Sequence, residues 1–309
     1  MKKTAAILFA LSLSGLAPAW ARPSLAGPFA AAAADFQKGN YSSAARFYSD
    51  VMATYKGSDW EAQAGLFLGQ CLIHLGKTDQ ATSILQYVAQ TFPQREEGQE
   101  AQMRLAEMAV SDGDVAGAEK IYSALGSQAS ASLAPWALLD LANLQARRHQ
   151  YQKALDTFSR LGSQFPGLPW TLREALTGKA KVYRKLKRDG EALQAYQQAA
   201  KISPDGAAAA QDLLESADLY YQAGRFDKAV EVYRKVAAGF PNDSAEALAF
   251  LGRAYHAQGK DIQARAAFQK VQDQDASSIW ADVARHWAQD MEQGEKRDGV
   301  NLDSLINSH

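Results

Sequence analysis

The densest concentration of ionisable side chains in the sequence is the run GKAKVYRKLKR at 178–188. Closely spaced cations of this kind can bind an acidic peptide, a carboxylate or another anionic polymer through charge-assisted hydrogen bonds. The same run is also typical of a solvated helix face whose cations favour the C-terminal end of the helix. Both interpretations are kept for this group, which comprises Lys179, Lys181, Arg184, Lys185, Lys187 and Arg188.

Residues that could support catalysis or metal binding are scattered along the chain. The five histidines include no pair at metal-ligand spacing within one expected helix. The run LGKT at 75–78 resembles the end of a phosphate-binding loop, but Cys71 stands where such a loop needs its leading glycine. Cys71 has apolar neighbours, which favours a buried small side chain over a reactive thiol. We therefore expect no enzyme, no cofactor and no metal site.

The N-terminal 21 residues, MKKTAAILFALSLSGLAPAWA, have the layout of a secretory signal peptide. Two lysines precede a short apolar stretch, and the AWA at 19–21 is a cleavage signal, so we expect cleavage before Arg22. A retained N-terminal anchor is the alternative, but the apolar stretch is short for a membrane span. The mature chain is expected to be exported, soluble, without a transmembrane segment, and located in a bacterial periplasm.

The charge and cysteine content exclude some classes of protein. The formal net charge is −1, and removal of Lys2 and Lys3 would bring it to about −3. A chain so close to neutral is not expected to bind nucleic acid. With a single cysteine, no intramolecular disulfide can form. Stability must therefore come from packing, for which 47% hydrophobic residues provide the material.

Three similar segments of eighteen residues occur in the chain. The segment GRFDKAVEVYRKVAAGFP at 224–241 has counterparts at 76–93 and 149–166, and each copy ends in Phe-Pro. One alanine of this segment recurs through the sequence at intervals of 35 to 38 residues. So regular a period indicates an array of one supersecondary unit. The alanines are Ala44, Ala81, Ala118, Ala154, Ala192, Ala229 and Ala264.

Residues at fixed distances from each alanine predict two packed helices per copy. Large apolar residues stand four and seven positions after it, such as Tyr233 and Val236 after Ala229, and share one helix face. A second small residue stands twelve positions before it, which allows a preceding helix to approach closely. Short turns, several of them with glycine, join the two helices. The second set of small residues comprises Ala32, Gly69, Ala106, Ala142, Ala180, Ala217 and Gly252.

Proline stands twelve positions after the repeated alanine in four of the copies. Proline removes a backbone donor and disfavours helix in the residue before it, so we expect it to end the second helix of the copy. The preceding phenylalanine is expected to fill the joint between copies. These prolines are Pro93, Pro166, Pro204 and Pro241, whereas the other copies have Lys56, Ser130 and Ala276.

This pattern of two small residues, an aromatic residue and a proline resembles the tetratricopeptide repeat. The resemblance covers residues 28–275 in seven copies, after a short linker at 22–27. It implies an all-α fold, a right-handed superhelical solenoid of about seven helix-turn-helix repeats. Residues 276–292 are expected to form a C-terminal capping helix, because an unpaired last repeat would expose its core. Residues 293–309 are expected to form a polar, flexible tail.

The resemblance also implies where a partner would bind, because first-helix residues line the concave face of such solenoids. The pattern of lysines and asparagines with which some of these proteins clamp a C-terminal carboxylate is incomplete here, since Leu66, Met103 and Leu139 occupy clamp positions. The mixture of apolar, aromatic and basic residues fits a peptide or protein segment with apolar anchors. The candidate residues are Trp136, Asn143, Arg147, Lys181, Arg184, Lys185 and Tyr221.

The exported array is similar to the repeat domains of the Tol-Pal accessory protein and of the outer-membrane assembly lipoprotein. It lacks the coiled coil of the first and the lipid-bearing cysteine of the second. We predict a non-catalytic periplasmic scaffold that binds a cell-envelope protein or peptide during envelope assembly or maintenance. The alternative is a glycan-associated protein of polysaccharide export or peptidoglycan organisation, which would bind an anionic glycan with the basic run and Trp136 or Trp170.

Overall fold

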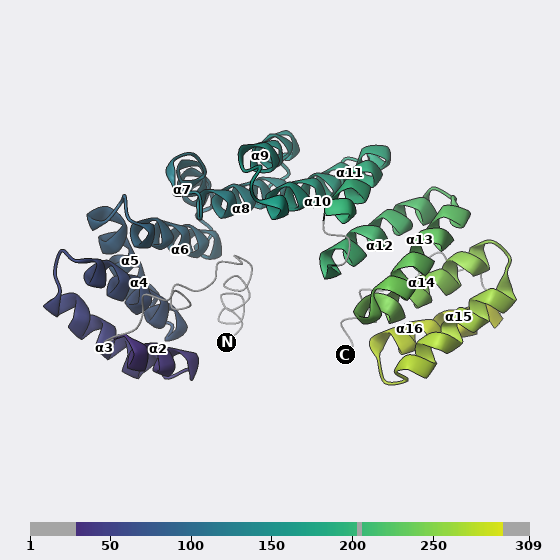
Figure 1. Cartoon of the computed structure of the whole chain (residues 1–309), viewed down its shortest axis with the longest axis horizontal. Coiled ribbons are helices and arrows are strands. Elements are labelled where there is room, and N and C mark those ends of the chain that lie inside the picture. Colours follow the sequence, from purple (N-terminus) through teal and green to yellow (C-terminus); the bar gives the residue numbers. More distant parts are fainter. Residues whose placement is uncertain (1–28, 203–205, 293–309) are drawn as a thin grey trace. The chain divides into compact units, whose positions relative to one another are not determined.

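The computed structural model describes residues 29–202 and 206–292, and this part contains helices and no strands. The predicted signal peptide, linker and tail lie outside the described residues, as does Pro204. Seven helix pairs and one last helix follow one another in this part of the chain (Figure 1). The pairs are α2 (Ala30–Gln37) and α3 (Tyr41–Thr54), α4 (Asp59–His74) and α5 (Thr78–Thr91), α6 (Glu96–Asp112) and α7 (Val115–Gln128), α8 (Ala134–Arg147) and α9 (Tyr151–Gln164), α10 (Pro169–Lys185) and α11 (Asp189–Ile202), α12 (Ala207–Gln222) and α13 (Phe226–Gly239), α14 (Ser244–Ala257) and α15 (Asp261–Gln274), followed by α16 (Ile279–Glu292).

The chain divides into two compact units, residues 1–161 and 162–309. The first unit contains the helices from α2 to most of α9, and the second contains α10 to α16. The short 3-10 helix η3 (Pro241–Asp243) lies between α13 and α14 in the second unit. No helix of the described residues is both long and apolar enough to cross a membrane.

The repeated small and large residues form the cores of both units. All seven repeated alanines are 0% exposed, and the large residue four positions after each of them is at most 4% exposed. At two of the first-helix positions, which are glycines, the facing side chain lies closer than a Cβ would allow without a shift. A Cβ on Gly69 would lie 2.6 Å from Leu85 Cδ2, and one on Gly252 would lie 2.4 Å from Phe268 Cε1. The large side chain of the second helix therefore fills the space that the small residue of the first helix leaves.

The turns within the pairs share one backbone conformation. Five of them have a glycine with a positive φ between 69° and 87°, which is the left-handed region that glycine enters without strain. In the fourth and fifth pairs, His149 and Lys187 occupy this position with φ of 59° and 57°. The turn is thus retained where the glycine is absent. The five glycines are Gly39, Gly76, Gly113, Gly224 and Gly259.

The Phe-Pro pairs follow directly on second helices. Helices α5, α9 and α13 end at Thr91, Gln164 and Gly239, so Pro93, Pro166 and Pro241 all stand two residues beyond a helix end. Phe92 and Phe240 are buried, whereas Phe165 is half-buried.

The last helix, α16, covers the seventh pair. Trp287 of α16 is buried, and its ring centroid lies 5.6 Å from that of Phe250 on α14 and 6.3 Å from that of Phe268 on α15. Val283 and Ala284, one turn before Trp287, are buried in the same core. The apolar side of α16 thus closes the core that the seventh pair would otherwise expose.

Candidate partner-binding face of the first helices

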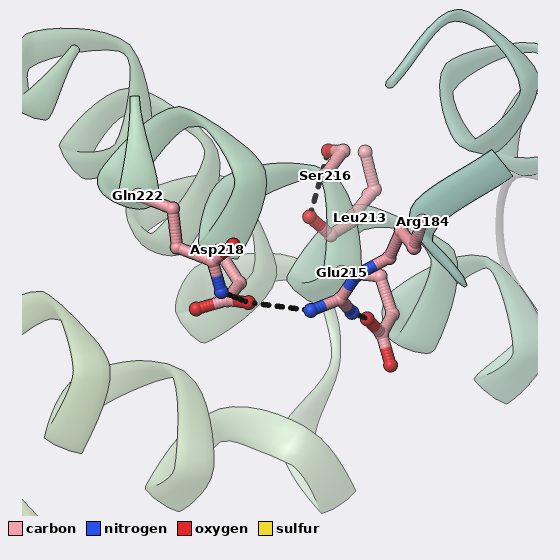
Figure 2. Close-up of polar contacts among 6 residues, drawn as sticks. All are labelled: Arg184, Leu213, Glu215, Ser216, Asp218 and Gln222. Atoms are coloured by element: carbon pink, nitrogen blue, oxygen red, sulfur yellow. Dashed lines mark hydrogen bonds and ion pairs between the residues drawn. The ribbon is translucent and has the colours of Figure 1, made fainter. Parts of the chain in front are cut away.

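Arg184 of α10 is paired with two carboxylates of α12, as Figure 2 shows. One guanidinium nitrogen donates to Glu215 and the other lies 3.1 Å from Asp218 Oδ2, which also accepts from Gln222 Nε2 at 2.7 Å. The side chains of Arg184, Glu215 and Asp218 are 31%, 26% and 27% exposed. The charge of Arg184 is therefore balanced within the protein, and the group connects two successive first helices.

The rest of the basic run divides between paired and exposed cations. Arg188 pairs with Glu191, and its Cζ lies 4.7 Å from the centre of the Tyr183 ring. Lys181 and Lys185 are exposed on α10. The two arginines are thus engaged in contacts within the chain, and a role in anion binding stays a prediction for Lys181 and Lys185.

Two carboxyl groups of the second unit are held away from water. Asp212 of α12 is 2% exposed and accepts a hydrogen bond of 2.8 Å from Thr177 Oγ1, while its Oδ2 has no hydrogen-bond partner among the described residues. Burial raises the pKa of Asp212 to about 6. Burial, helped by Asp243 and Glu215, raises the pKa of the half-buried Glu246 on α14 to about 7.

Tyr221 of α12 belongs to a group of aromatic rings around one guanidinium. The Cζ atom of Arg253 on α14 lies 4.1 Å from the ring centre of Tyr221, 5.5 Å from that of Trp287 and 5.7 Å from that of Phe250. Arg253 and Tyr221 are both half-buried. Such contacts hold a cation in place by attraction to the ring faces. Side chains from α12, α14 and α16 thus meet at Arg253.

In the first unit, the candidate residues of α8 lie near buried charges. Asn143 and Arg147 are exposed, whereas Trp136 is half-buried and packs against the core. Burial and the charge of Glu107 raise the pKa of Asp140 to about 7, against the opposing effect of Arg147 and Arg104. This site therefore contains an easily protonated carboxyl group beside Arg147.

Arg104 and Glu107 of α6 form a shielded ion pair next to these residues. Arg104 Nη1 lies 2.8 Å from Glu107 Oε2, and the two side chains are 10% and 12% exposed. Arg104 Nε has no hydrogen-bond partner among the described residues. Because the positive charge of Arg104 and the negative charge of Glu107 cancel, this pair adds little net charge to the face that a partner would meet.

The residues that could support catalysis or metal binding are packed among other side chains of the fold. Cys71 is fully buried, and burial raises the pKa of its thiol to about 12, so the nucleophilic thiolate is disfavoured. His74 stacks on Tyr41 with a ring-centre distance of 4.2 Å, and burial lowers the pKa of its imidazole. Within residues 29–202 and 206–292, no three His, Cys, Asp or Glu side chains are grouped so that they could hold a metal ion.

The two tryptophans considered for glycan binding, Trp136 and Trp170, are half-buried rather than exposed. A sugar ring stacks on an aromatic face that is open to solvent. The glycan hypothesis therefore gains no support from these two side chains and stays a prediction.

Sequence reasoning found part of this face. It identified Arg184 and Tyr221 but left out the acidic residues around them, Glu215 and Glu246, and treated the run at 178–188 as basic. Glu215, Asp218 and Gln222 stand three and four positions apart on one helix, which is a signal for a shared face. Their pairing with Arg184 depends on how α10 packs against α12, for which the sequence has no comparable signal.

Four family models of the tetratricopeptide repeat match the chain, at residues 35–105, 136–167, 171–242 and 214–279. No curated protein sequence matches it. Among solved structures, the C-terminal part of a TPR repeat-containing protein from Cytophaga hutchinsonii is similar, with a TM-score of 0.59 and 14% identity over 83% of this chain and 98% of that part.

Two further solved structures are similar over most of the chain. PilF of Pseudomonas aeruginosa has a TM-score of 0.53 and 19% identity over 78% of this chain and 100% of its own. A tetratricopeptide repeat protein from Parabacteroides merdae has a TM-score of 0.51 and 16% identity over 80% of this chain and 97% of its own. At such low identity these likenesses show the fold alone, and they confirm the predicted all-α fold class.

Proposed function

Because the chain is a tetratricopeptide-repeat protein, we propose that it is a non-catalytic scaffold of the bacterial periplasm. It binds a segment of a partner protein on the face formed by its first helices and acts in cell-envelope assembly or maintenance. Tetratricopeptide-repeat proteins generally bind peptides or other proteins without catalysis, through surfaces built from successive repeats. The likeness to the repeat domains of the Tol-Pal accessory protein and of the outer-membrane assembly lipoprotein stays a prediction.

The observation that carries the proposal is the meeting of half-buried charged and aromatic side chains on α10, α12 and α14. We name this group the first-helix patch. Tyrosine and arginine are enriched among the residues that contribute most to protein interfaces. Side chains already held by neighbours lose little conformational freedom when a partner binds. The patch consists of Arg184, Glu215, Asp218, Tyr221, Glu246 and Arg253.

The electrostatics of the first-helix patch favour a partner segment of mixed character. The three carboxyl groups outnumber the two guanidinium groups, and Arg184 already pairs with Glu215 and Asp218. Glu246 has a raised pKa because its charged form is poorly solvated. A cationic side chain of the partner beside Glu246 would stabilise the charged carboxylate, while an apolar side chain would pack on Tyr221.

Photo-crosslinking in cells tests this proposal. A photoreactive residue is placed at Lys181 or Tyr221, on first helices of the second unit, and at Lys120, an exposed second-helix position on α7. We expect the first two positions to yield an adduct with the same partner protein and Lys120 to yield none. The adduct formed from Lys181 should decrease when Tyr221 and Arg253 are both changed to alanine.

Two outcomes would contradict the proposal. Equal adducts from Lys120 and Lys181 would mean that the first helices have no special role. Adducts from Lys181 that persist unchanged in the Tyr221→Ala/Arg253→Ala variant would place partner binding outside the first-helix patch. The melting temperature of each variant is measured in parallel, so that a loss of folding is not mistaken for a loss of binding.

A further inference from the structure

A groove lies between the second helices α13 and α15, with α14 as its floor. Its volume is about 570 Å3, within the usual range for ligand-binding clefts. The floor is apolar and consists of Leu248, Leu251 and Tyr255. Each of these side chains is mostly buried, and little of it faces water. We name it the second-helix groove.

The second-helix groove exists because both of its walls have small side chains. Ala237 and Ala238 line it from α13, and Ala266 and Ala267 line it from α15. Two helices with larger residues at these positions would fill the space between them by interdigitation. Here the alanine side chains are too short to meet across the groove, so a space remains above Leu248, Leu251 and Tyr255, which are 5–8% exposed.

An exposed isoleucine extends this apolar surface along α15. Ile262 is 84% exposed, the highest value among the exposed large hydrophobic side chains of the described residues. It stands four positions before Ala266 and eight before Lys270, so the three lie along one side of the helix. Its side chain contributes nothing to the core and offers an apolar contact to a segment that lies along α15.

The charged side chains that line the second-helix groove are both basic. Arg234 lines it from α13 and Lys270 from α15, and both are exposed. The Cζ atom of Arg234 lies 5.4 Å from the ring centre of Tyr255, which holds the guanidinium at the edge of the floor. No acidic side chain is among the residues that line the groove. A bound segment would therefore meet an apolar floor with a cation on each wall.

The groove and the first-helix patch lie on opposite sides of α14. Leu248, Leu251 and Tyr255 follow one another by three and four positions, as do Glu246, Phe250 and Arg253. With 100° of rotation per residue, the two series point in nearly opposite directions. The groove therefore uses other side chains of α14 than the partner-binding face proposed above.

We propose that the second-helix groove is a second docking surface, for an acidic amphipathic segment of a partner protein. Aliphatic side chains of that segment occupy the floor and contact Ile262. Its carboxylates pair with Arg234 and Lys270 on the two walls. Charge complementarity favours an acidic segment, because its carboxylates would be attracted to Arg234 and Lys270, whereas a basic segment would be repelled by both.

Two synthetic peptides of matched design test this proposal. Both are fourteen-residue amphipathic helices with leucines on one face, and they differ only in flanking residues, which are glutamates in one peptide and lysines in the other. Binding is followed by fluorescence anisotropy with the full chain carrying Tyr221→Ala, so that the first-helix patch, which favours a cationic and apolar segment, contributes little to the signal. We expect the glutamate peptide to bind and the lysine peptide to bind at least about tenfold more weakly.

Charge reversal of the groove should exchange this preference. In the Arg234→Glu/Lys270→Glu variant, the affinity for the glutamate peptide should fall roughly tenfold and that for the lysine peptide should rise. The variant Lys120→Glu/Lys153→Glu carries the same change of net charge on exposed second-helix positions of the first unit. It should bind both peptides as the unchanged protein does.

Several outcomes would overturn the proposal. The first is that neither peptide binds, and the second is that both bind with the same affinity. The third is that the two charge-reversed variants change the peptide affinities by the same amount. A concentration-dependent dimer in sedimentation that dissociates in Arg234→Glu/Lys270→Glu would also overturn it, because the occupant would then be a second copy of the chain. Unchanged melting temperatures of the variants exclude unfolding as the cause of a lost interaction.

Discussion

At the scale of single residues, the small side chains of the first helices determine how closely two helices approach. Replacement of Gly252 by leucine would place atoms where the ring of Phe268 now lies, since even a Cβ would be 2.4 Å from Phe268 Cε1. Phe268 is buried and packs against Trp287 of the last helix. We expect Gly252→Leu to lower the free energy of unfolding by roughly 1–3 kcal/mol.

Thermal and urea denaturation of Gly252→Leu measure this loss. Lys185→Ala is the control, because Lys185 is exposed on α10 and its loss leaves the cores unchanged. Equal melting temperatures for the two variants would contradict the assignment of Gly252 to a close helix contact.

Two carboxyl groups should give the stability of the protein a distinct dependence on pH. Asp140 and Glu246 have pKa values of about 7 in the folded chain, above ordinary values of 3.8 and 4.5. Between about pH 4 and 7 the folded chain therefore holds more protons than the unfolded chain, so the free energy of unfolding falls as pH rises through this window. The penalty is largest above pH 7 and absent below the unfolded pKa values.

The double variant Asp140→Asn/Glu246→Gln should remove much of this dependence. We expect its melting temperature to exceed that of the unchanged protein at pH 8 and the difference to shrink at pH 5. Asp50→Asn, a change of an exposed carboxylate on α3, is the control. A double variant that is less stable at pH 8 would show that these carboxylates have stabilising partners when charged.

The residue scale is also where the sequence was most informative for the fold. The spacing of small and large residues predicts their burial because one regular period relates them all. The raised pKa values of Asp140 and Glu246 could not be predicted in this way. They depend first on burial by the packed helices, and then on charges such as Glu107 on α6 for Asp140 and Asp243 and Glu215 for Glu246.

At the scale of elements, Arg184 connects α10 to α12 through Glu215 and Asp218. Its replacement by glutamine leaves two partly buried carboxylates facing each other without their cation. We expect Arg184→Gln to lower the free energy of unfolding by about 1–2 kcal/mol, and less at high salt. Arg188→Gln, which breaks the exposed pair with Glu191, should have a smaller effect. Denaturation at two ionic strengths measures both, and equal losses would contradict a special role for Arg184.

The last helix should stabilise the repeat that it covers. Trp287 is buried against Phe250 and Phe268, so Trp287→Ala should cost roughly 3–5 kcal/mol locally. In a repeat array such a loss acts first on the neighbouring elements. Hydrogen exchange should therefore become faster in α14 and α15 than in α10. The exposed Gln289→Ala is the control, and uniform protection in both variants would contradict the capping role of α16.

Sequence reasoning predicted which helices form but not every connection between them. The turns at His149 and Lys187 have the left-handed conformation without a glycine, which the absence of glycine at these positions did not predict. The run at 178–188 is compatible with a basic groove or with a solvated helix face. In the structure Arg188 pairs with Glu191, only three positions further along the chain, whereas Arg184 pairs with acids of α12. This second pairing could not be read from the order of residues along α10.

At the scale of the whole molecule, export is the first claim to test. The sequence AWA at 19–21 predicts removal of the first 21 residues, which would leave Arg22 as the N-terminus. Mass spectrometry of the protein from a periplasmic fraction should find that end. Ala21→Leu, which places a large residue at the cleavage signal, should block processing. A protein in the cytoplasmic fraction that still begins at Met1 would contradict export.

The central claim is that the first helices of this repeat protein bind a segment of a partner protein. The most direct measurement compares photo-crosslinks formed in cells from Tyr221 on a first helix with those from Lys120 on a second helix. The account predicts one partner protein crosslinked from Tyr221, none from Lys120, and a loss of the Tyr221 adduct when Arg253 is changed to alanine. Adducts of equal yield from both positions, or an adduct that Arg253→Ala leaves unchanged, would contradict it.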